Sequence, residues 1–188
     1  MSRLLKGAVF LQKKGLTLVY TGNGKGKTTA AVGLAVRAVG QGLKVGFFQF
    51  IKSPDFVTGE RIALEKLGVE VLQLGIGFTW RKTPEEHREA IKNGFELVKE
   101  KISSDQYDLI ILDELNNVLA ITNFPIEDIL SVQDVLELIK TRPERLHLVL
   151  TGRNAKEEII EAADLVSSVE ELKHYYDQGR SAVVGIEY

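Results

Sequence analysis

The sequence contains no cysteine, and this absence excludes several kinds of chemistry. Without cysteine, the 188-residue chain can form no disulfide framework, hold no thiolate-bound metal and use no cysteine nucleophile. Histidine is almost as scarce, since His87, His147 and His174 are the only three. A histidine-based zinc site would need nearly all of them, and their spacing is unlike that of zinc ligands.

Long hydrophobic runs and an excess of one charge are also missing. The amino terminus, MSRLLKGAVFLQKKG, has too short an apolar run for a signal peptide or a membrane span. Lysine and arginine number 24 against 26 acidic residues, which gives a net charge of -2 and no general reason to expect nucleic acid as a partner. We therefore expect a cytoplasmic protein that binds neither nucleic acid nor a membrane.

Short, continuous apolar runs recur along the chain, as is typical of strands buried on both faces of a parallel sheet. The expected strands cover residues 16–20, 44–50, 69–74, 107–113 and 146–151, with a weaker run at 182–187. Helical patterns lie between them: over 27–39, from a capping box at 83–86 to 102, from Ser131 to near Pro143, and after an Asn154 cap. This alternation predicts one three-layer α/β domain over residues 1–188 with a mostly parallel central sheet.

A glycine-rich turn connects the first expected strand to the first expected helix. It approaches the phosphate-binding pattern G-x-x-x-x-G-K-[ST], although Thr21 stands where the first glycine belongs. The N–H groups of such a turn and the following helix terminus form a site for anions. Lys27 would reach phosphates and the Thr28 hydroxyl would ligate Mg²⁺. Thr21 fits this role if its φ is negative, and the proposed cradle consists of Gly22, Asn23, Gly24, Lys25, Gly26, Lys27, Thr28 and Thr29.

Four apolar residues lead into an acidic pair, Asp113 and Glu114, in the manner of a Walker B strand. A carboxylate there would hold Mg²⁺ or Mn²⁺ opposite Thr28, directly or through water. If the strand continued through Glu114, the two acids would point to opposite faces and only one would be a direct ligand. The sequence thus predicts a P-loop NTPase fold, and a fold does not name the reaction.

Two further segments are candidates for ligand contact. Lys52, Glu60 and Arg61 follow the second expected strand, so they are either ligand contacts at the carboxyl edge of the sheet or ordinary loop charges. Phe78 and Trp80 alternate on a glycine-flanked loop, where they would either stack on a flat ligand or pack beneath the loop. The tail that begins at Thr151 is expected to be structural.

Taken together, these segments resemble the P-loop ATP:corrinoid adenosyltransferases of cobalamin biosynthesis and salvage. The motifs occur in the family's order from about Leu16 onward, and Thr21 is the family's usual residue. The matching motifs are T-G-N-G-K-G-K-T-T (21–29), Q-F-I-K (49–52), G-E-R (59–61), G-F-T-W (77–80), L-D-E-L (112–115), T-G-R (151–153) and K-H-x-x-D-x-G (173–179), with a terminal G-I-E-Y.

The resemblance implies a RecA-like fold and transfer of the 5′-deoxyadenosyl group of ATP to the Co(I) of a reduced corrinoid, with release of triphosphate. The corrinoid would be cobalamin, cobinamide or a cobyrinic acid diamide. ATP would bind in the reverse of the common P-loop orientation, so that the ribose C5′ is exposed and Lys27 and Lys25 hold the departing triphosphate.

The resemblance also gives roles to the aromatic loop and to partner proteins. Phe78 and Trp80 would crowd the lower face of the corrin and exclude its axial base, which makes Co(II) easier to reduce. A reduced flavoprotein would deliver the electron, and the family usually works as a homodimer. Some relatives carry a longer amino-terminal helix over the corrinoid; here residues 1–15 would form a short helix over a neighbour's site or a mobile segment.

Two other functions stay open at this point. A RecA-like ATPase or small-molecule kinase needs a residue that orients water or an acceptor hydroxyl, and the sequence reveals none. A non-catalytic nucleotide-binding regulator would need only the phosphate-binding loop.

Overall fold

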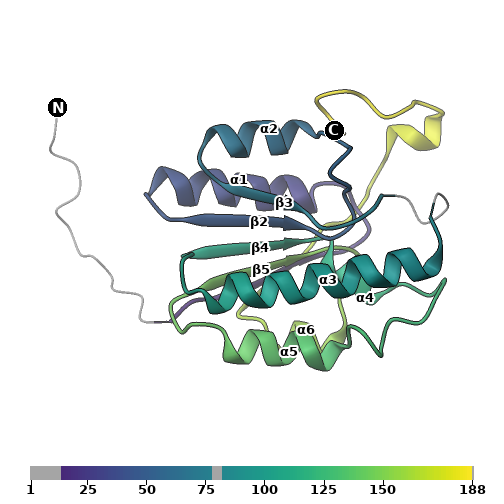
Figure 1. Cartoon of the computed structure of the whole chain (residues 1–188). Helices are drawn as coiled ribbons and strands as arrows, with labels where there is room; N and C mark the ends of the chain where they lie inside the picture. Colours follow the sequence, from purple (N-terminus) through teal and green to yellow (C-terminus); the bar gives the residue numbers. More distant parts are fainter. Residues whose placement is uncertain (1–13, 78–81, 188) are drawn as a thin grey trace, which may run out of the picture.

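The centre of the molecule is a six-stranded sheet in which every strand pairs with its neighbours in parallel, in the order β3-β2-β4-β5-β1-β6. This computed structural model describes residues 14–77 and 82–187 (Figure 1). The mostly parallel sheet predicted from the sequence is confirmed. The strands are β1 (Thr17–Thr21), β2 (Val45–Gln49), β3 (Glu70–Gln73), β4 (Leu109–Asp113), β5 (His147–Thr151) and β6 (Leu165–Ser168).

Helices cover both faces of the sheet and complete the predicted three layers (Figure 1). One face carries α1 (Lys27–Gly40) and α2 (Gly59–Lys66). The other carries α3 (Pro84–Ser103), α4 (Leu115–Leu119), α5 (Val132–Thr141) and α6 (Glu157–Ala162). A short 3₁₀ helix, η1 (Tyr175–Gln178), lies in the carboxyl-terminal segment.

The two helical layers explain why the central strands are apolar at every position. Along β4, Ile111 belongs to the buried cluster that includes the alanines of α1, while Ile110 and Leu112 belong to the cluster that includes Phe95 of α3. Successive residues of a strand point to opposite faces, so a sheet covered on both sides needs hydrophobic residues throughout. All five residues of β4 are buried.

Two helix starts follow their sequence signals. The Thr83 hydroxyl accepts from the N–H of Glu86 while the Glu86 carboxylate accepts from the N–H of Thr83, at 3.2 and 2.8 Å, so the expected capping box opens α3. Ser131 caps α5 through a second such box with Asp134. Each box satisfies N–H groups that a helix terminus leaves unpaired.

The sixth strand is not where the sequence indicated. Residues 184–187 form a turn, and residues 182 and 183 before it have no regular structure; Gly185 has φ 78°, and the N–H of Glu187 bonds to the carbonyl of Val183 at 2.8 Å. The outer edge of β1 is instead paired with β6. The prediction of a strand at 182–187 is therefore wrong, because the N–H groups of Ile186 and Glu187 bond to the carbonyl of Val183 and close a turn instead of an extended chain.

Three further corrections concern helices. Asn154 does not cap α6; it adopts a left-handed φ of 55°, and Lys156 precedes the first helical residue. The segment Gly59-Glu60-Arg61, treated above as a loop, is the first turn of α2, where the Thr58 hydroxyl accepts from the N–H of Arg61. The short α4 directly after β4 was not predicted at all.

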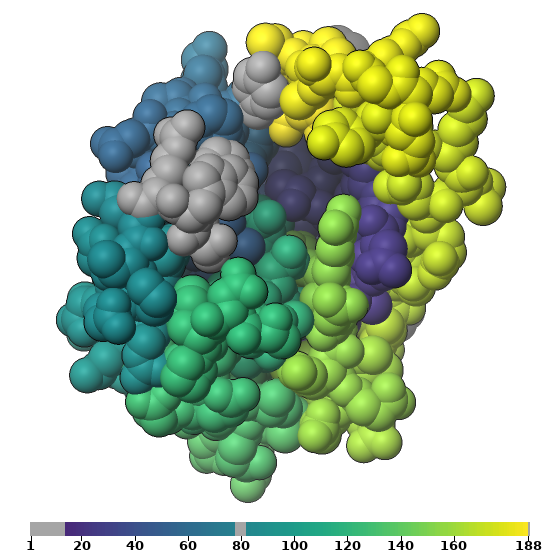
Figure 2. All heavy atoms as spheres, turned by 90° about the vertical axis from the view of Figure 1, so that its right-hand side faces the viewer, coloured from purple at the N-terminus to yellow at the C-terminus, as the bar shows by residue number. Residues whose placement is uncertain are grey.

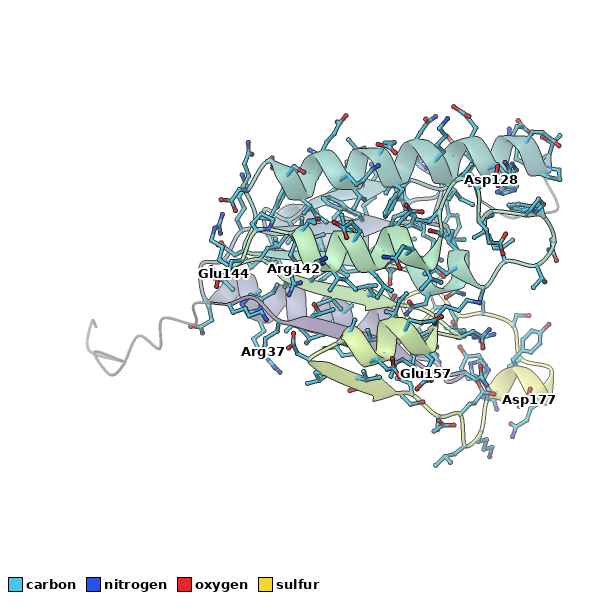
Figure 3. The ribbon with its side chains drawn as sticks, turned by 90° about the horizontal axis from the view of Figure 1, so that it is seen from below. Arg37, Asp128, Arg142, Glu144, Glu157 and Asp177 are labelled. Carbon is cyan, nitrogen blue, oxygen red and sulfur yellow. The ribbon has the colours of Figure 1, made fainter. Side chains whose placement is uncertain are left out.

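The strands all end at one edge of the sheet, which faces the viewer in Figure 2. Asp128 and Asp177 lie toward this end in Figure 3, whereas Arg142 and Glu144 lie toward the opposite end. There the Arg142 guanidinium donates to the carbonyls of Gly15 and Leu146, each at 3.0 Å, and so ties the start of the described chain to the turn before β5. Within residues 14–77 and 82–187, none of the helices has both the length and the hydropathy for a bilayer span.

Candidate functional site

A cavity of about 590 Å³ opens at the carboxyl edge of the sheet. Figure 2 shows this edge as a hollow, with purple residues of the β1–α1 region inside it and the yellow carboxyl-terminal segment on its rim. Six parts of the chain line the cavity: the phosphate loop with the start of α1, Lys52 in the loop after β2, the start of α2, the β4–α4 junction, the end of β5 with the turn after it, and residues 171, 174 and 185–187 of the carboxyl-terminal segment. They are brought together because parallel strands place their ends, and the loops that follow, at one edge.

The phosphate loop, residues 22–26, has the backbone that its glycines allow. Gly22 and Gly26 have φ of 90° and 124°, in the region that disfavours other residues. A Cβ on Gly22 would also lie 2.5 Å from the carbonyl oxygen of Val169. No side chain caps α1, whose first turn begins directly after Gly26 and lines the cavity. The amino terminus of this 14-residue helix thus faces the cavity, as in an anion site.

Thr21 occupies the place of the missing glycine without strain. It is the last residue of β1, and its φ lies outside the left-handed region. Its hydroxyl accepts from the N–H of Ala155 at 3.2 Å, and its carbonyl accepts from the N–H of Val169 at 2.9 Å. The expectation that Thr21 fits with a negative φ agrees with this geometry, and its side chain joins the loop to the segment before α6.

The Lys27 ammonium is held inside the phosphate loop. It donates to the carbonyls of Gly22 at 2.7 Å and Gly24 at 2.6 Å. Burial lowers its pKa, as does the nearby charge of Arg153, while Glu114 and Glu171 act in the opposite direction. Lys27 also lines the cavity, so its charge is available to an anion there.

Asp113, at the end of β4, lies directly beneath the start of α1. Its Oδ1 accepts from the hydroxyls of Thr28 at 2.9 Å and Thr151 at 2.7 Å, and its Oδ2 accepts from the Gln49 amide at 3.3 Å. The side chain is fully buried. Burial raises its pKa, and the three hydrogen bonds counteract that shift.

Glu114 leaves the strand in a different direction from the one expected. Its φ of 63° is left-handed and the strand ends at Asp113, so the condition under which the two acids would alternate on one strand is not met. The Glu114 carboxyl lines the cavity, and its Oε2 is buried without a hydrogen-bond partner among the described residues. Burial, followed by the charge of Asp113, raises its pKa to about 7.

The oxygen atoms around Thr28 fit a hard divalent cation. The Thr28 hydroxyl, Asp113 and Glu114 offer the ligand type that Mg²⁺ prefers. No group of three or more histidine, cysteine or acidic residues that could hold a metal alone occurs in the part of the chain that the structure describes. This donor set suits an ion that is also held by phosphate oxygens and water, as in P-loop proteins.

Of the remaining predicted site residues, some line the cavity and others do not. Lys52 and Glu60 line the cavity, and Glu60 accepts from the Gln49 amide at 3.2 Å. Arg61 donates instead to the side chains of Gln73 at 2.7 Å and Glu65 at 3.0 Å, and it is not part of the cavity lining. Asn23 is exposed and likewise does not line the cavity, whereas Phe78 and Trp80 lie outside the described residues.

Sequence reasoning missed several residues that line the cavity. Thr151 ends β5, and Gly152 and Arg153 begin the turn that follows, where a Cβ on Gly152 would lie 2.4 Å from the Asn117 side chain. The tail considered structural also lines the cavity, through Glu171, His174 and residues 185–187. The position of the turn could have identified it as part of the cavity, because it follows a buried strand just as the phosphate loop does.

Comparison with solved structures identifies the fold. The KaiC-like protein PH0186 of Pyrococcus horikoshii superposes with a TM-score of 0.56 at 15% identity, covering 86% of this chain and 75% of that one. The flagellar accessory protein FlaH of Methanocaldococcus jannaschii gives 0.54 at 13% identity, covering 83% and 71%. The RecA-like P-loop NTPase fold predicted from the sequence is thereby confirmed.

Comparison with known sequences identifies the family. The family model described as ATP:corrinoid adenosyltransferase BtuR/CobO/CobP matches residues 13–188. The corrinoid adenosyltransferase of Escherichia coli K12 is 40% identical over 177 residues, which cover 94% of this chain and 87% of that protein. Corrinoid adenosyltransferase CobA of Salmonella typhimurium is 38% identical, with the same two coverages, 94% and 87%. The chain therefore belongs to the ATP:corrinoid adenosyltransferase family.

Proposed function

We propose that this chain transfers the 5′-deoxyadenosyl group of ATP to the Co(I) of a reduced corrinoid and releases inorganic triphosphate. The observation that carries the proposal is the phosphate loop with its buried acid, Asp113, beside one cavity in a chain of this transferase family. ATP is the co-substrate and the corrinoid is the acceptor.

The chemistry fits a site without an evident general base. The electron pair of Co(I) forms the bond to C5′, the C5′–O bond breaks, and its electron pair leaves with the triphosphate. Cobalt changes formally from +1 to +3, and no proton has to be removed from the nucleophile. The site must therefore align the reactants and stabilise the leaving group, rather than activate water.

The groups that line the cavity have the charge that this task requires. The Lys27 ammonium, the N–H groups of the phosphate loop and the amino terminus of α1 would stabilise the negative charge of the departing triphosphate. Thr28, Asp113 and Glu114 would hold Mg²⁺, which when bound neutralises part of that charge. The triphosphate would lie in the reverse of the common orientation and so present C5′ to the corrinoid.

The remaining parts of the proposal concern partners. Phe78 and Trp80 would pack against the lower face of the corrin and keep its axial base away from cobalt. Removing that σ-donor lowers the orbital that accepts the electron, so Co(II) is reduced more easily by a reduced flavoprotein. We also propose that the chain works as a homodimer in the cytoplasm.

The direct test supplies ATP and a chemically reduced corrinoid and follows the formation of a cobalt–carbon bond. The expected product is an adenosylcorrinoid whose visible spectrum reverts on illumination, since light breaks that bond. Steady hydrolysis of ATP without corrinoid, and no light-sensitive product with it, would indicate a RecA-like ATPase instead.

A further inference from the structure

A carboxylate from the far end of the chain contacts the phosphate loop. The Lys25 ammonium donates to Oε2 of Glu187 at 2.7 Å, and both residues line the cavity. The two side chains are only partly accessible, at 35% and 23% of their maximum. A cation on the loop proposed to hold a triphosphate is thus already paired with an internal anion.

The segment that ends with Glu187 is also attached to the phosphate loop farther back, at Val169. The N–H of Gly24 donates to the carbonyl of Val169 at 2.7 Å, and the N–H of Val169 donates to the carbonyl of Thr21 at 2.9 Å. The turn before the terminus is closed by the N–H of Glu187 bonding to the carbonyl of Val183 at 2.8 Å. The segment therefore has its own attachment to the loop, and the Lys25–Glu187 pair is not its sole attachment.

The second carboxylate oxygen of Glu187, Oε1, indicates that the residue does more than attach the segment to the loop. Oε1 is buried and has no hydrogen-bond partner among the described residues. A carboxylate with only one of its oxygens engaged retains negative charge, and this charge would repel a nearby polyphosphate. Breaking its contact with Lys25 therefore costs less than breaking a fully bonded pair would.

We propose that Glu187 competes with the triphosphate for Lys25 and thereby promotes release of the product. The inference rests on the proposed function, in which triphosphate is the leaving group. When the C5′–O bond breaks, triphosphate acquires an additional anionic oxygen, so a loop that stabilises this charge binds the product more tightly than the equivalent part of ATP. An internal carboxylate that takes back Lys25 offsets that excess affinity.

The test is a double-mutant cycle on triphosphate binding, with inorganic triphosphate as the titrant in isothermal calorimetry. Glu187→Gln keeps the shape and removes the charge, so it should bind triphosphate about twofold to fivefold more tightly than the parent, the range expected for a partly exposed ion pair. Lys25→Met should bind more weakly, and in that background Glu187→Gln should gain clearly less affinity than it gains when Lys25 is present.

A matched control separates this pair from general charge. Glu170 lies on the same segment, and its carboxylate accepts from the Ser168 hydroxyl at 2.9 Å rather than from Lys25. Glu170→Gln removes the same charge and should leave triphosphate affinity unchanged. If Glu187→Gln is poorly folded by circular dichroism, Glu187→Asp, which retracts the carboxylate, should still give an affinity above that of the parent.

Two outcomes overturn the proposal. Equal affinity of the parent and Glu187→Gln would show that the Lys25–Glu187 ion pair has no effect on triphosphate binding. Weaker binding by Glu187→Gln would show that the ion pair instead holds the site in its binding conformation. Calorimetry of triphosphate needs no turnover, so either outcome alongside normal adenosyl transfer refutes only this inference. Loss of the proposed function would appear separately, as absence of the cobalt–carbon product.

Discussion

At the scale of single residues, Lys27 carries the most direct prediction about catalysis. Its ammonium lies inside the phosphate loop and faces the cavity, so it is placed to stabilise the leaving triphosphate. Lys27→Ala should lower kcat/KM for adenosyl transfer by at least about 100-fold, the effect of removing one preorganised charged donor. Initial rates with chemically reduced corrinoid measure this. Lys140→Ala, on the exposed side of α5, is the control and should retain the parent rate.

Asp113 carries a second residue-scale prediction, which separates metal binding from nucleotide binding. Asp113→Asn places an amide where three donors converge, so unpaired polar groups remain in a buried site. We expect a loss of about 1–3 kcal/mol in the free energy of unfolding. We also expect ATP affinity to lose most of its dependence on Mg²⁺, measured by calorimetry with Mg²⁺ and with EDTA. An unchanged response to Mg²⁺ in this variant would exclude Asp113 from the metal site.

The residues of the site differ in whether a short sequence motif identifies them. Lys27, Thr28 and Asp113 could be predicted because each belongs to a short motif whose strand and helix context is readable. Arg153 had only the weaker signal of its position after a buried strand, and Glu187 had no such signal, because the turn that contains it belongs to no strand or helix. Arg61 shows the converse, since a charge beside the site in sequence donates to Gln73 and Glu65 instead.

At the scale of elements, the phosphate loop packs closely against the segment around Val169 because residue 22 is glycine. Gly22→Ala would force a residue with a side chain to φ 90° and place its Cβ 2.5 Å from the Val169 carbonyl. Strain of this kind costs about 1–3 kcal/mol, so the variant should unfold at lower urea concentration and bind ATP more weakly.

Gly33→Ala is the matched control for that substitution. Gly33 lies inside α1, and a Cβ there meets nothing within 4 Å. Because alanine favours a helix interior by about 0.5–1 kcal/mol, this variant should be more stable than the parent. If both variants shifted the urea midpoint in the same direction, the proposed cause of the Gly22 effect would be wrong.

The errors at this scale also have a physical explanation. β6 escaped prediction because all four of its residues are exposed at the edge of the sheet, so the strand lacks the apolar run that identified the central strands. The segment 182–187 has that apolar character, but the N–H groups of Ile186 and Glu187 bond to Val183 within a turn rather than to a neighbouring strand. The five-residue α4 and eight-residue α2 are too short for a helical period to show clearly.

At the scale of the whole molecule, we expect the free energy of unfolding to depend on pH through His147, which lies at the amino edge of the sheet. Nδ1 of His147 accepts from the N–H of Leu16 at 3.1 Å, a bond that needs the neutral ring. Burial lowers the pKa of His147, and the charge of Arg142 lowers it further, while Asp108 opposes both. The folded pKa thus lies below the unfolded value of about 6.5. This contribution to stability is complete above about pH 6.5 and decreases as the pH falls below it.

Urea unfolding at pH 7.5 and 5.5 measures this dependence. His147→Asn removes the titrating group, so its free energy of unfolding should fall less between the two pH values than that of the parent. A fall of equal size in both proteins would show that other groups cause the acid sensitivity.

The whole molecule is a nucleotide-binding scaffold in which the phosphate loop, the residues after β4 and β5, and the carboxyl-terminal segment meet at one cavity (Figures 1 and 2). The overall fold was predictable because continuous apolar strands alternating with amphipathic helices permit few arrangements. Under the proposed function, this scaffold presents carbon, rather than phosphorus, to the nucleophile.

Phosphorus NMR of the products formed from ATP and chemically reduced corrinoid distinguishes attack at carbon from attack at phosphorus. Attack at C5′ leaves all three phosphates joined, so we expect inorganic triphosphate in a one-to-one ratio with the adenosylcorrinoid. ADP with phosphate as the products would show attack at the γ-phosphorus and would contradict the proposed function.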